Sequence, residues 1–213
     1  MTRGWIAIGA LGPPALAVRV GIARSDRRVI AYVLVWTLLA LLVRAVHRRW
    51  PLPPLALGAL VGAGVLHLAG GLLPSPDAGA PILYETWLVP GTLKFDQVAH
   101  FAISAVVAAV LFEVLGHVID PRQAGPAVRA TLALLVTWGF GAANELFEFL
   151  SAARFPDAYV GDLSNAGWDL AFNTAGSATA VIACAVLAGT SRQPNSAQRM
   201  SSTHASTAPA TIR

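Results

Sequence analysis

The chain has 213 residues, of which 55% are hydrophobic and only 12% are charged, and its mean hydropathy is +0.61. A soluble domain carries about 25% charged residues, so this composition excludes an ordinary water-facing surface and predicts that the chain lies in a lipid bilayer. The formal net charge of +4 does not indicate nucleic-acid binding, because the basic residues stand in short groups between apolar runs. The single cysteine, Cys184, excludes an intrachain disulfide.

Six apolar stretches approach the length of about 20 residues that a membrane-spanning helix needs. The first is poorly hydrophobic and contains Pro13-Pro14 and Arg19, so it is either a first span or a helix at the membrane edge. The second is short before Arg44, whose long side chain can reach the interface. The predicted fold is an all-α, polytopic membrane helix bundle over residues 1–189, with about six transmembrane helices near 4–22, 29–46, 53–73, 97–119, 128–150 and 166–189.

The connecting segments differ in character. The 74–95 segment contains four prolines, and Tyr84 and Trp87 are its candidate interfacial anchors, whereas the 151–165 segment is short and polar. Residues 190–213 are rich in Ser, Thr, Ala and Pro, which predicts a disordered C-terminal tail. Six spans with a cytoplasmic N-terminus place nine arginines inside and five basic residues outside, which favours an extracytoplasmic position for the 74–95 and 151–165 loops.

Polar and ionisable residues lie within or beside four of the predicted spans, where they are costly and indicate a functional site by default. Successive spans cross in opposite directions, so the end of the third, the start of the fourth, the end of the fifth and the start of the sixth share one membrane face. The candidate metal ligands at this face are His67, Asp96, His100, Glu145, Glu148, Asp162, Asp169 and Asn173.

The spacing of these residues predicts that they converge. Residues four apart share one helix face, and three such pairs are present: Asp96 with His100, Asn144 with Glu148, and Asp169 with Asn173. Neighbouring carboxylates in a medium of low dielectric constant cannot all stay ionised alone, so either some are protonated or a cation balances them. Carboxylate and imidazole ligands suit a divalent metal such as Zn²⁺ or Mn²⁺.

Three interpretations of this polar pocket stay open. It can be a hydrogen-bonded lattice in a structural membrane protein that fixes helix register. It can be a metal-assisted catalytic site with Glu145, Glu148 and Asp169 as the catalytic residues. It can also be a proton- or ion-coupled transport site. Glu113 and His117, at the opposite end of the fourth span, are instead typical of an ion pair that reaches Arg129 or Arg122. No Gly-rich phosphate loop, nucleophile elbow or HExxH motif occurs in the sequence.

Three short motifs carry a family resemblance that covers roughly residues 60–185. Residues 95–101 read FDQVAHF, residues 145–149 read ELFEF, and Gly161-Asp162 is followed by Asp169. In this order they resemble the motifs of the YjdF-like group of uncharacterised bacterial inner-membrane proteins. That group has a second acid and a glutamine after its Gly-Asp, where this chain has Asn165 and Gly167. Residues 169–176, DLAFNTAG, are similar to a motif of the VanZ-like group.

The resemblance implies a multi-pass protein of the bacterial cytoplasmic membrane, and the VanZ-like motif loosely implies a role at the cell envelope. If the pocket is catalytic, the chemistry that fits best is metal-assisted hydrolysis or group transfer on a lipid-linked envelope substrate. The partners we expect are the lipid bilayer and such a substrate, without nucleic acid. The oligomeric state does not follow from the sequence.

Overall fold

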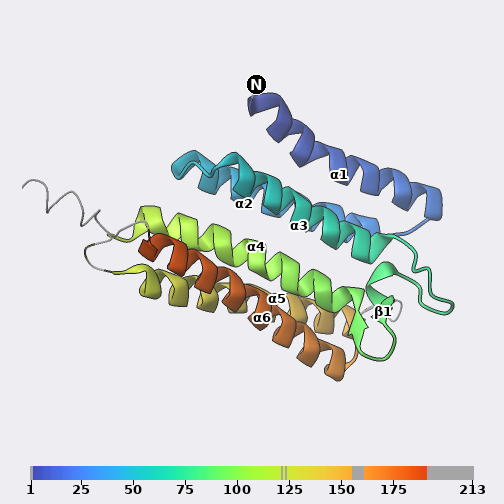
Figure 1. Ribbon diagram of the computed structural model, residues 1–213. Coiled ribbons are helices and arrows are strands. Elements are labelled where there is room, and N and C mark those ends of the chain that lie inside the picture. The colour runs from blue at the N-terminus through green and yellow to red at the C-terminus, as the bar shows by residue number, and fades with distance from the viewer. Residues whose placement is uncertain (1, 121, 123, 155–160, 191–213) are drawn as a thin grey trace, which may run out of the picture.

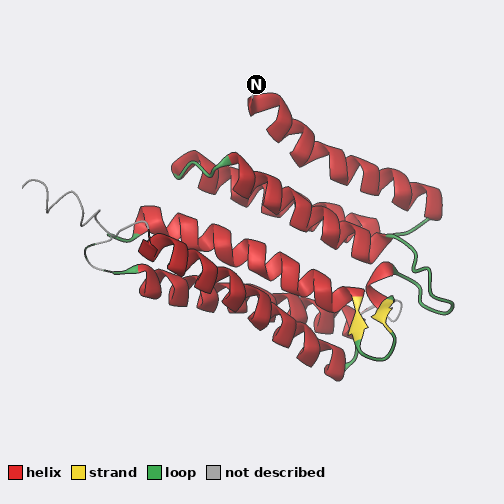
Figure 2. Ribbon diagram, viewed as in Figure 1, coloured by secondary structure: helices red, strands yellow, loops and turns green. Residues whose placement is uncertain are grey.

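The computed structural model describes residues 2–120, 122, 124–154 and 161–190, and only the backbone of residues 2–10. Long helices with similar axis directions make up nearly all of this part of the chain (Figures 1 and 2). Five of the helices described are long and apolar enough to cross a membrane. The long helices are α1 (Thr2–Arg24), α2 (Arg28–Arg49), α3 (Pro54–Leu72), α4 (Phe95–Val118), α5 (Pro126–Arg154) and α6 (Leu163–Thr190).

The predicted all-α membrane bundle is confirmed, with one difference in the number of spans. Each predicted span falls largely within one helix, but α1 is not among the five candidates. Its proline pair and Arg19 lower the hydropathy of the segment that was predicted as the first span. At the other end, only Thr190 of the predicted 190–213 tail is described, as the last residue of α6, so the prediction of disorder lies outside the described residues.

The helices pack as two groups of three (Figure 1). Ala17, Val29, Leu68 and Leu72 bring α1, α2 and α3 together. Ala108, Phe112, Ala133 and Val181 form the core of α4, α5 and α6. Contacts between α3 and α4 join the two groups.

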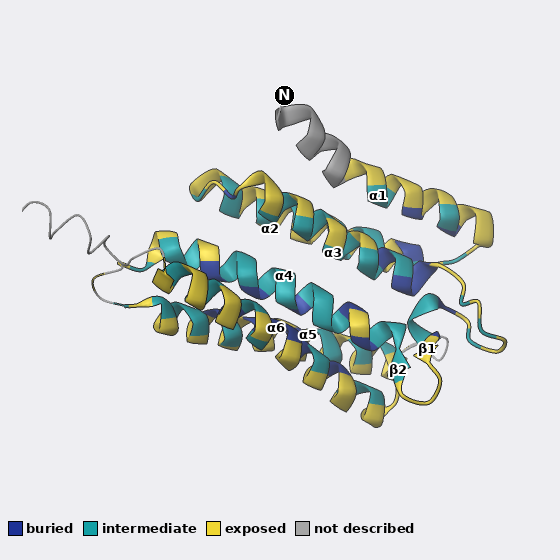
Figure 3. Cartoon of the chain, in the orientation of Figure 1, coloured by how far each residue is buried: buried dark blue, intermediate teal, exposed yellow. Residues whose placement is uncertain are grey.

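Much of the outward surface of the helices is exposed (Figure 3), and many large apolar side chains are among the exposed residues. Leu38 on α2 and Ile182 and Leu187 on α6, for example, are each more than half exposed. A soluble monomer rarely leaves so much contiguous apolar surface uncovered, whereas hydrocarbon chains cover such a surface in a bilayer. The helices α5 and α6 contain 29 and 28 residues and are therefore about 42 Å long, which exceeds the roughly 30 Å hydrocarbon core. Their ends extend beyond the core unless they tilt.

The segment between α3 and α4, which the sequence predicts as a long loop with four prolines, contains regular structure. A short 3-10 helix, η1 (Leu83–Glu85), precedes an antiparallel hairpin of β1 (Trp87–Val89) and β2 (Leu93–Lys94). Gly91 in the hairpin turn has a φ of +69°, which glycine adopts without steric cost. The Lys94 amide donates to Gln97 Oε1 at 3.0 Å and so satisfies one free N–H at the start of α4. The hairpin thus fixes where α4 begins.

An ion pair at the corner between α1 and α2 gives a pH-dependent prediction. The Arg28 side chain donates to both carboxylate oxygens of Asp26, at 2.9 and 2.7 Å, and this hydrogen bonding lowers the pKa of Asp26 below its ordinary 3.8. The stabilisation is therefore present above pH 3.8 and is lost as the pH falls through the lowered folded-state value. We expect Asp26→Asn to reduce the free energy of unfolding by about 0.5–1 kcal/mol at pH 7. Chemical denaturation should show this difference shrinking as the pH falls below 4, and a difference independent of pH would contradict it.

Candidate functional site

Four helix ends position the polar residues at one end of the bundle. The end of α3, the start of α4, the end of α5 and the start of α6 lie together beside the β1–β2 hairpin, as the chain topology predicts (Figure 1). His100 lies five residues after the start of α4, Asp169 six residues after the start of α6, and Glu148 six residues before the end of α5. At 1.5 Å per residue, all three lie about 8–9 Å from those helix ends, and so at a similar depth.

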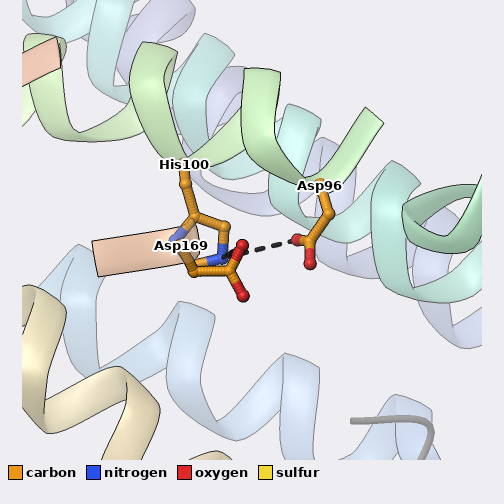
Figure 4. A group of neighbouring side chains, drawn as sticks. All are labelled: Asp96, His100 and Asp169. Carbon is orange, nitrogen blue, oxygen red and sulfur yellow. Dashed lines mark ion pairs between the residues drawn. The ribbon is translucent and has the colours of Figure 1, made fainter. Parts of the chain in front are cut away.

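Asp96, His100 and Asp169 form the centre of the site (Figure 4). His100 Nε2 lies 3.4 Å from Asp96 Oδ1 and 4.0 Å from Asp169 Oδ1. One ligand atom from each residue lies within 4.8 Å of the other two. Ligands around one ion at about 2.1 Å are separated from each other by roughly 3–4 Å. The three residues can therefore hold a single cation if their widest ligand separation closes by about 1–2 Å.

A buried amide sets the protonation of His100. Its Nδ1 lies 3.2 Å from Asn173 Oδ1, which also accepts a hydrogen bond from Ser104 Oγ at 2.5 Å. Because an amide oxygen only accepts, His100 Nδ1 must carry the proton in this contact. In the neutral imidazole, Nε2 then has the free lone pair, and it faces the two carboxylates. Metal-binding histidines are commonly oriented by a hydrogen bond to the other ring nitrogen in this way.

Asp169 has a carboxylate oxygen that lacks a hydrogen-bond donor. Its side chain is 0% exposed, and Asn165 Nδ2 donates to its Oδ2 at 2.5 Å. Its Oδ1 has no hydrogen-bond partner in the described part of the chain. A buried carboxylate is costly unless its oxygens are paired or bind a cation. The unpartnered oxygen is also the one that faces His100 Nε2, so the deficit lies where a cation would bind.

Asn165 is a site residue that was not among the predicted ligands. Its Nδ2 bridges Asp169 Oδ2 and, at 3.2 Å, Asp96 Oδ2, so it holds the two carboxylates side by side. Each carboxylate therefore keeps its other oxygen for the centre of the site. The available signal was the position of Asn165, one helical turn before Asp169 and on the same helix face.

Glu145 and Glu148 approach His100 from α5. Together the three residues offer a second set of ligand atoms within 4.8 Å of one another. Asn144 Nδ2 donates to Glu148 Oε1 at 2.8 Å, as the predicted spacing of four residues allows, and to Glu145 Oε1 at 3.4 Å. Both sets include His100, and because its Nδ1 is used by Asn173, only its Nε2 is left to bind a cation.

Two of the predicted ligands are not part of this group. His67 Nδ1 contacts the Tyr84 hydroxyl at 2.6 Å, and the same hydroxyl lies 3.2 Å from the His67 backbone oxygen. Burial raises the pKa of Tyr84 well above its ordinary value, so the phenol stays a neutral donor. Asp162 is exposed. Its Oδ1 accepts a hydrogen bond from the backbone N–H of Asn165 at 2.9 Å, so it caps the first turn of α6. Asn173 touches the site through its hydrogen bonds and orients His100.

The pair predicted at the opposite end of the bundle is also present. Glu113 and His117 lie 3.7 Å apart, and both are largely exposed. Arg129 does not join this pair through an ion pair and instead stacks on the Phe112 ring at 4.4 Å. This cluster therefore has the geometry of an interfacial ion pair.

Comparison with known families agrees with the architecture. Residues 7–190 match the family model described as "predicted membrane protein (DUF2238)". The chain belongs to this DUF2238 family. No curated protein and no solved structure matches the chain.

The family match covers all the site residues and most of every long helix. It agrees with the resemblance to uncharacterised YjdF-like membrane proteins and with a multi-pass membrane protein. The similarity to the VanZ-like group stays a prediction, as do a bacterial source and the particular membrane. Membership in the DUF2238 family assigns no reaction, so the function must be argued from the site.

Proposed function

We propose that this DUF2238 protein is a membrane-embedded hydrolase or transferase that depends on a divalent cation and acts on a lipid-linked substrate. The observation that carries the proposal is the unpartnered, fully buried Asp169 Oδ1, which faces His100 Nε2 and Asp96 Oδ1. Among the described residues, Asp169 Oδ1 lacks the hydrogen-bond donor that a closed polar lattice would provide. A cation such as Zn²⁺ or Mn²⁺ satisfies all three at once.

The site divides into a cation-binding side and a proton-transferring side. Asp96, His100 and Asp169 would hold the cation, which supplies Lewis-acid activation of a phosphoryl or ester oxygen. Glu145 and Glu148 lie next to His100 on the opposite helix, where a carboxylate can accept a proton from an attacking water. In hydrolysis the water oxygen attacks phosphorus or carbonyl carbon, the bond to the leaving oxygen breaks, and Glu148 passes the proton to that oxygen.

The buried residues beyond the site disfavour a transport pathway. Moving along α4, α5 and α6 toward the other membrane face, the next buried layer contains Ala108, Phe112, Ala133 and Val181. The hydroxyls of Thr137 and Ser177, which lie between, donate to backbone oxygens of their own helices at 2.8 and 2.7 Å. A proton or ion route needs polar groups across the full thickness. In the described helices, the connected buried polar side chains are confined to one end of the bundle. This arrangement fits an enzyme site better than a transport pathway.

The resemblance and the charge distribution support a proposal for the cellular setting. We propose the bacterial cytoplasmic membrane, with the site at the extracytoplasmic face. The end of the bundle opposite the site carries Arg44, Arg48 and Arg49 near the end of α2, Arg122 just before α5 and Arg129 in the first turn of α5. Arginine-rich loops face the cytoplasm in most membrane proteins.

The test of the reaction is lipid turnover by the purified protein in proteoliposomes made from a total bacterial lipid extract. We expect water-soluble headgroup to be released only with added Mn²⁺ or Zn²⁺, and Glu148→Gln to slow this release by roughly 100-fold or more. The matched control is Glu113→Gln, the same change at the exposed pair on the far side of the bundle, which should leave the rate unchanged. Release that does not depend on cation, or equal loss in both variants, would overturn the proposal.

A further inference from the structure

A groove between α5 and α6 connects the lipid-facing surface with the site. Its volume is about 250 Å³, and it is lined by Trp138, Ala142, Leu170, Asn173 and Thr174. Trp138 and Leu170 are 42% and 41% exposed, so the groove opens on the outer face of two candidate spanning helices. What lies against that face in a membrane is hydrocarbon.

The innermost residue of this groove is a polar one. Asn173 is only 4% exposed, and its Oδ1 is used by His100 and Ser104. Its Nδ2 has no hydrogen-bond partner among the residues that the structure describes. The amide lies against Gly141, where even a single Cβ would approach Nδ2 to 3.0 Å. This N–H group is therefore available to donate to an oxygen atom supplied from the groove that Asn173 lines.

We infer that this groove is the lateral opening through which the substrate reaches the site, and that the substrate is a membrane lipid. The lipid chain lies between α5 and α6, and an ester or phosphoryl oxygen at the end of that chain accepts from Asn173 Nδ2. Through Asn173 that oxygen is one residue away from His100 and the carboxylates. The volume is below the roughly 300–1,000 Å³ of pockets that enclose a whole small molecule, which suits part of a chain with the rest in the bilayer. That the bound lipid reacts rests on the proposed function, whereas the binding of lipid in the groove does not depend on it.

Photolabelling with a lipid probe tests the groove. The protein is placed in vesicles of phosphatidylethanolamine and a phosphatidylglycerol whose acyl chain carries a diazirine, and labelled peptides are quantified. We expect the labels to concentrate on the α5 and α6 segments that line the groove. Ala142→Phe, which fills the groove, should reduce this labelling roughly tenfold, as losing the burial of about two methylene groups implies.

Ala143→Phe is the matched control, because Ala143 is the next residue on α5, is exposed and does not line the groove. It should leave the labelling unchanged. Equal labelling in both variants, or a groove-specific cross-link between two copies of the protein in place of lipid, would overturn the inference. A diether form of the probe separates the two acceptors: lost labelling assigns the ester oxygen, and retained labelling the phosphoryl oxygen.

Cation content measured in the same preparations separates this inference from the proposed function. Groove labelling without any bound cation would reject the cation-dependent reaction and keep the lipid groove. If a cation is bound but Ala142→Phe does not reduce the labelling, the cation site stands and the groove is not the route for lipid.

Discussion

Replacing Asp169 with Asn should abolish stabilisation by divalent cations without harming the fold. A ligand present at 100 times its Kd stabilises the native state by about 2.7 kcal/mol, and the parent protein should gain roughly this amount from Mn²⁺ or Zn²⁺. The variant keeps the shape of the side chain but loses the ligand charge. In chelator, Asp169→Asn should be at least as stable as the parent, because a neutral amide is cheaper to bury than a carboxylate with an unpartnered oxygen. Thermal melts of both proteins with chelator and with each cation measure the difference.

Asp162→Asn provides the matched control for this prediction. It is the same chemical change at an exposed residue just before α6. The Asp162 side chain accepts a hydrogen bond from the backbone N–H of Asn165. It should cost about 1 kcal/mol or less in both conditions and leave the response to cation intact. If added cation does not raise the melting temperature of the parent protein, the metal-site hypothesis is wrong. An equal response in Asp169→Asn and the parent would place the cation elsewhere.

The second large effect is expected at Gly176, where α6 packs against the backbone of α4. A Cβ at Gly176 would lie 2.1 Å from the backbone oxygen of Phe101, which cannot move without moving α4. Gly176→Val must therefore separate two helices that together carry His100 and Asp169. Overpacking a core ordinarily costs about 1–3 kcal/mol, and a clash with backbone should reach or exceed the upper figure. We expect most of the variant to be lost as aggregate in size-exclusion chromatography after detergent extraction.

Gly189→Val on the same helix separates this clash from the general effect of valine in a helix. A Cβ at Gly189 has no neighbouring atom within 4 Å, so this variant should be extracted and melt like the parent. If Gly176→Val behaves like Gly189→Val, the close packing of α4 against α6 is wrong, and with it the distances at the site.

The helix content and the convergence of the site could be predicted from the sequence, because both follow from length and order. Apolar runs of bilayer length fix the spans, and alternation of direction fixes which ends meet. The spacing of four residues correctly predicted that Asn144 meets Glu148, since helical periodicity is a local property. Hydropathy also separated the weak first segment, with its proline pair, from the others, and α1 is indeed outside the candidate spans.

The parts that could not be predicted depend on rotation and on side-chain direction. His67 and Asp162 lie at the same membrane face as the site, but His67 turns toward Tyr84 and Asp162 serves the start of α6. Depth in the membrane does not specify which way a side chain points around its helix. The sequence did not indicate Asn165 for a related reason. Its role depends on the direction of its side-chain amide, which donates hydrogen bonds to both Asp96 and Asp169.

The central claim is that a divalent cation binds at His100 Nε2, and pulsed EPR of the Mn²⁺-loaded protein tests it most directly. A nitrogen ligand to Mn²⁺ modulates the electron spin echo, and incorporation of ¹⁵N-histidine identifies that nitrogen as imidazole. We predict modulation from one histidine that is lost in His100→Gln and kept in His67→Gln, because His67 is engaged by Tyr84. A Mn²⁺ signal without nitrogen modulation, or one that His100→Gln leaves unchanged, would contradict the account.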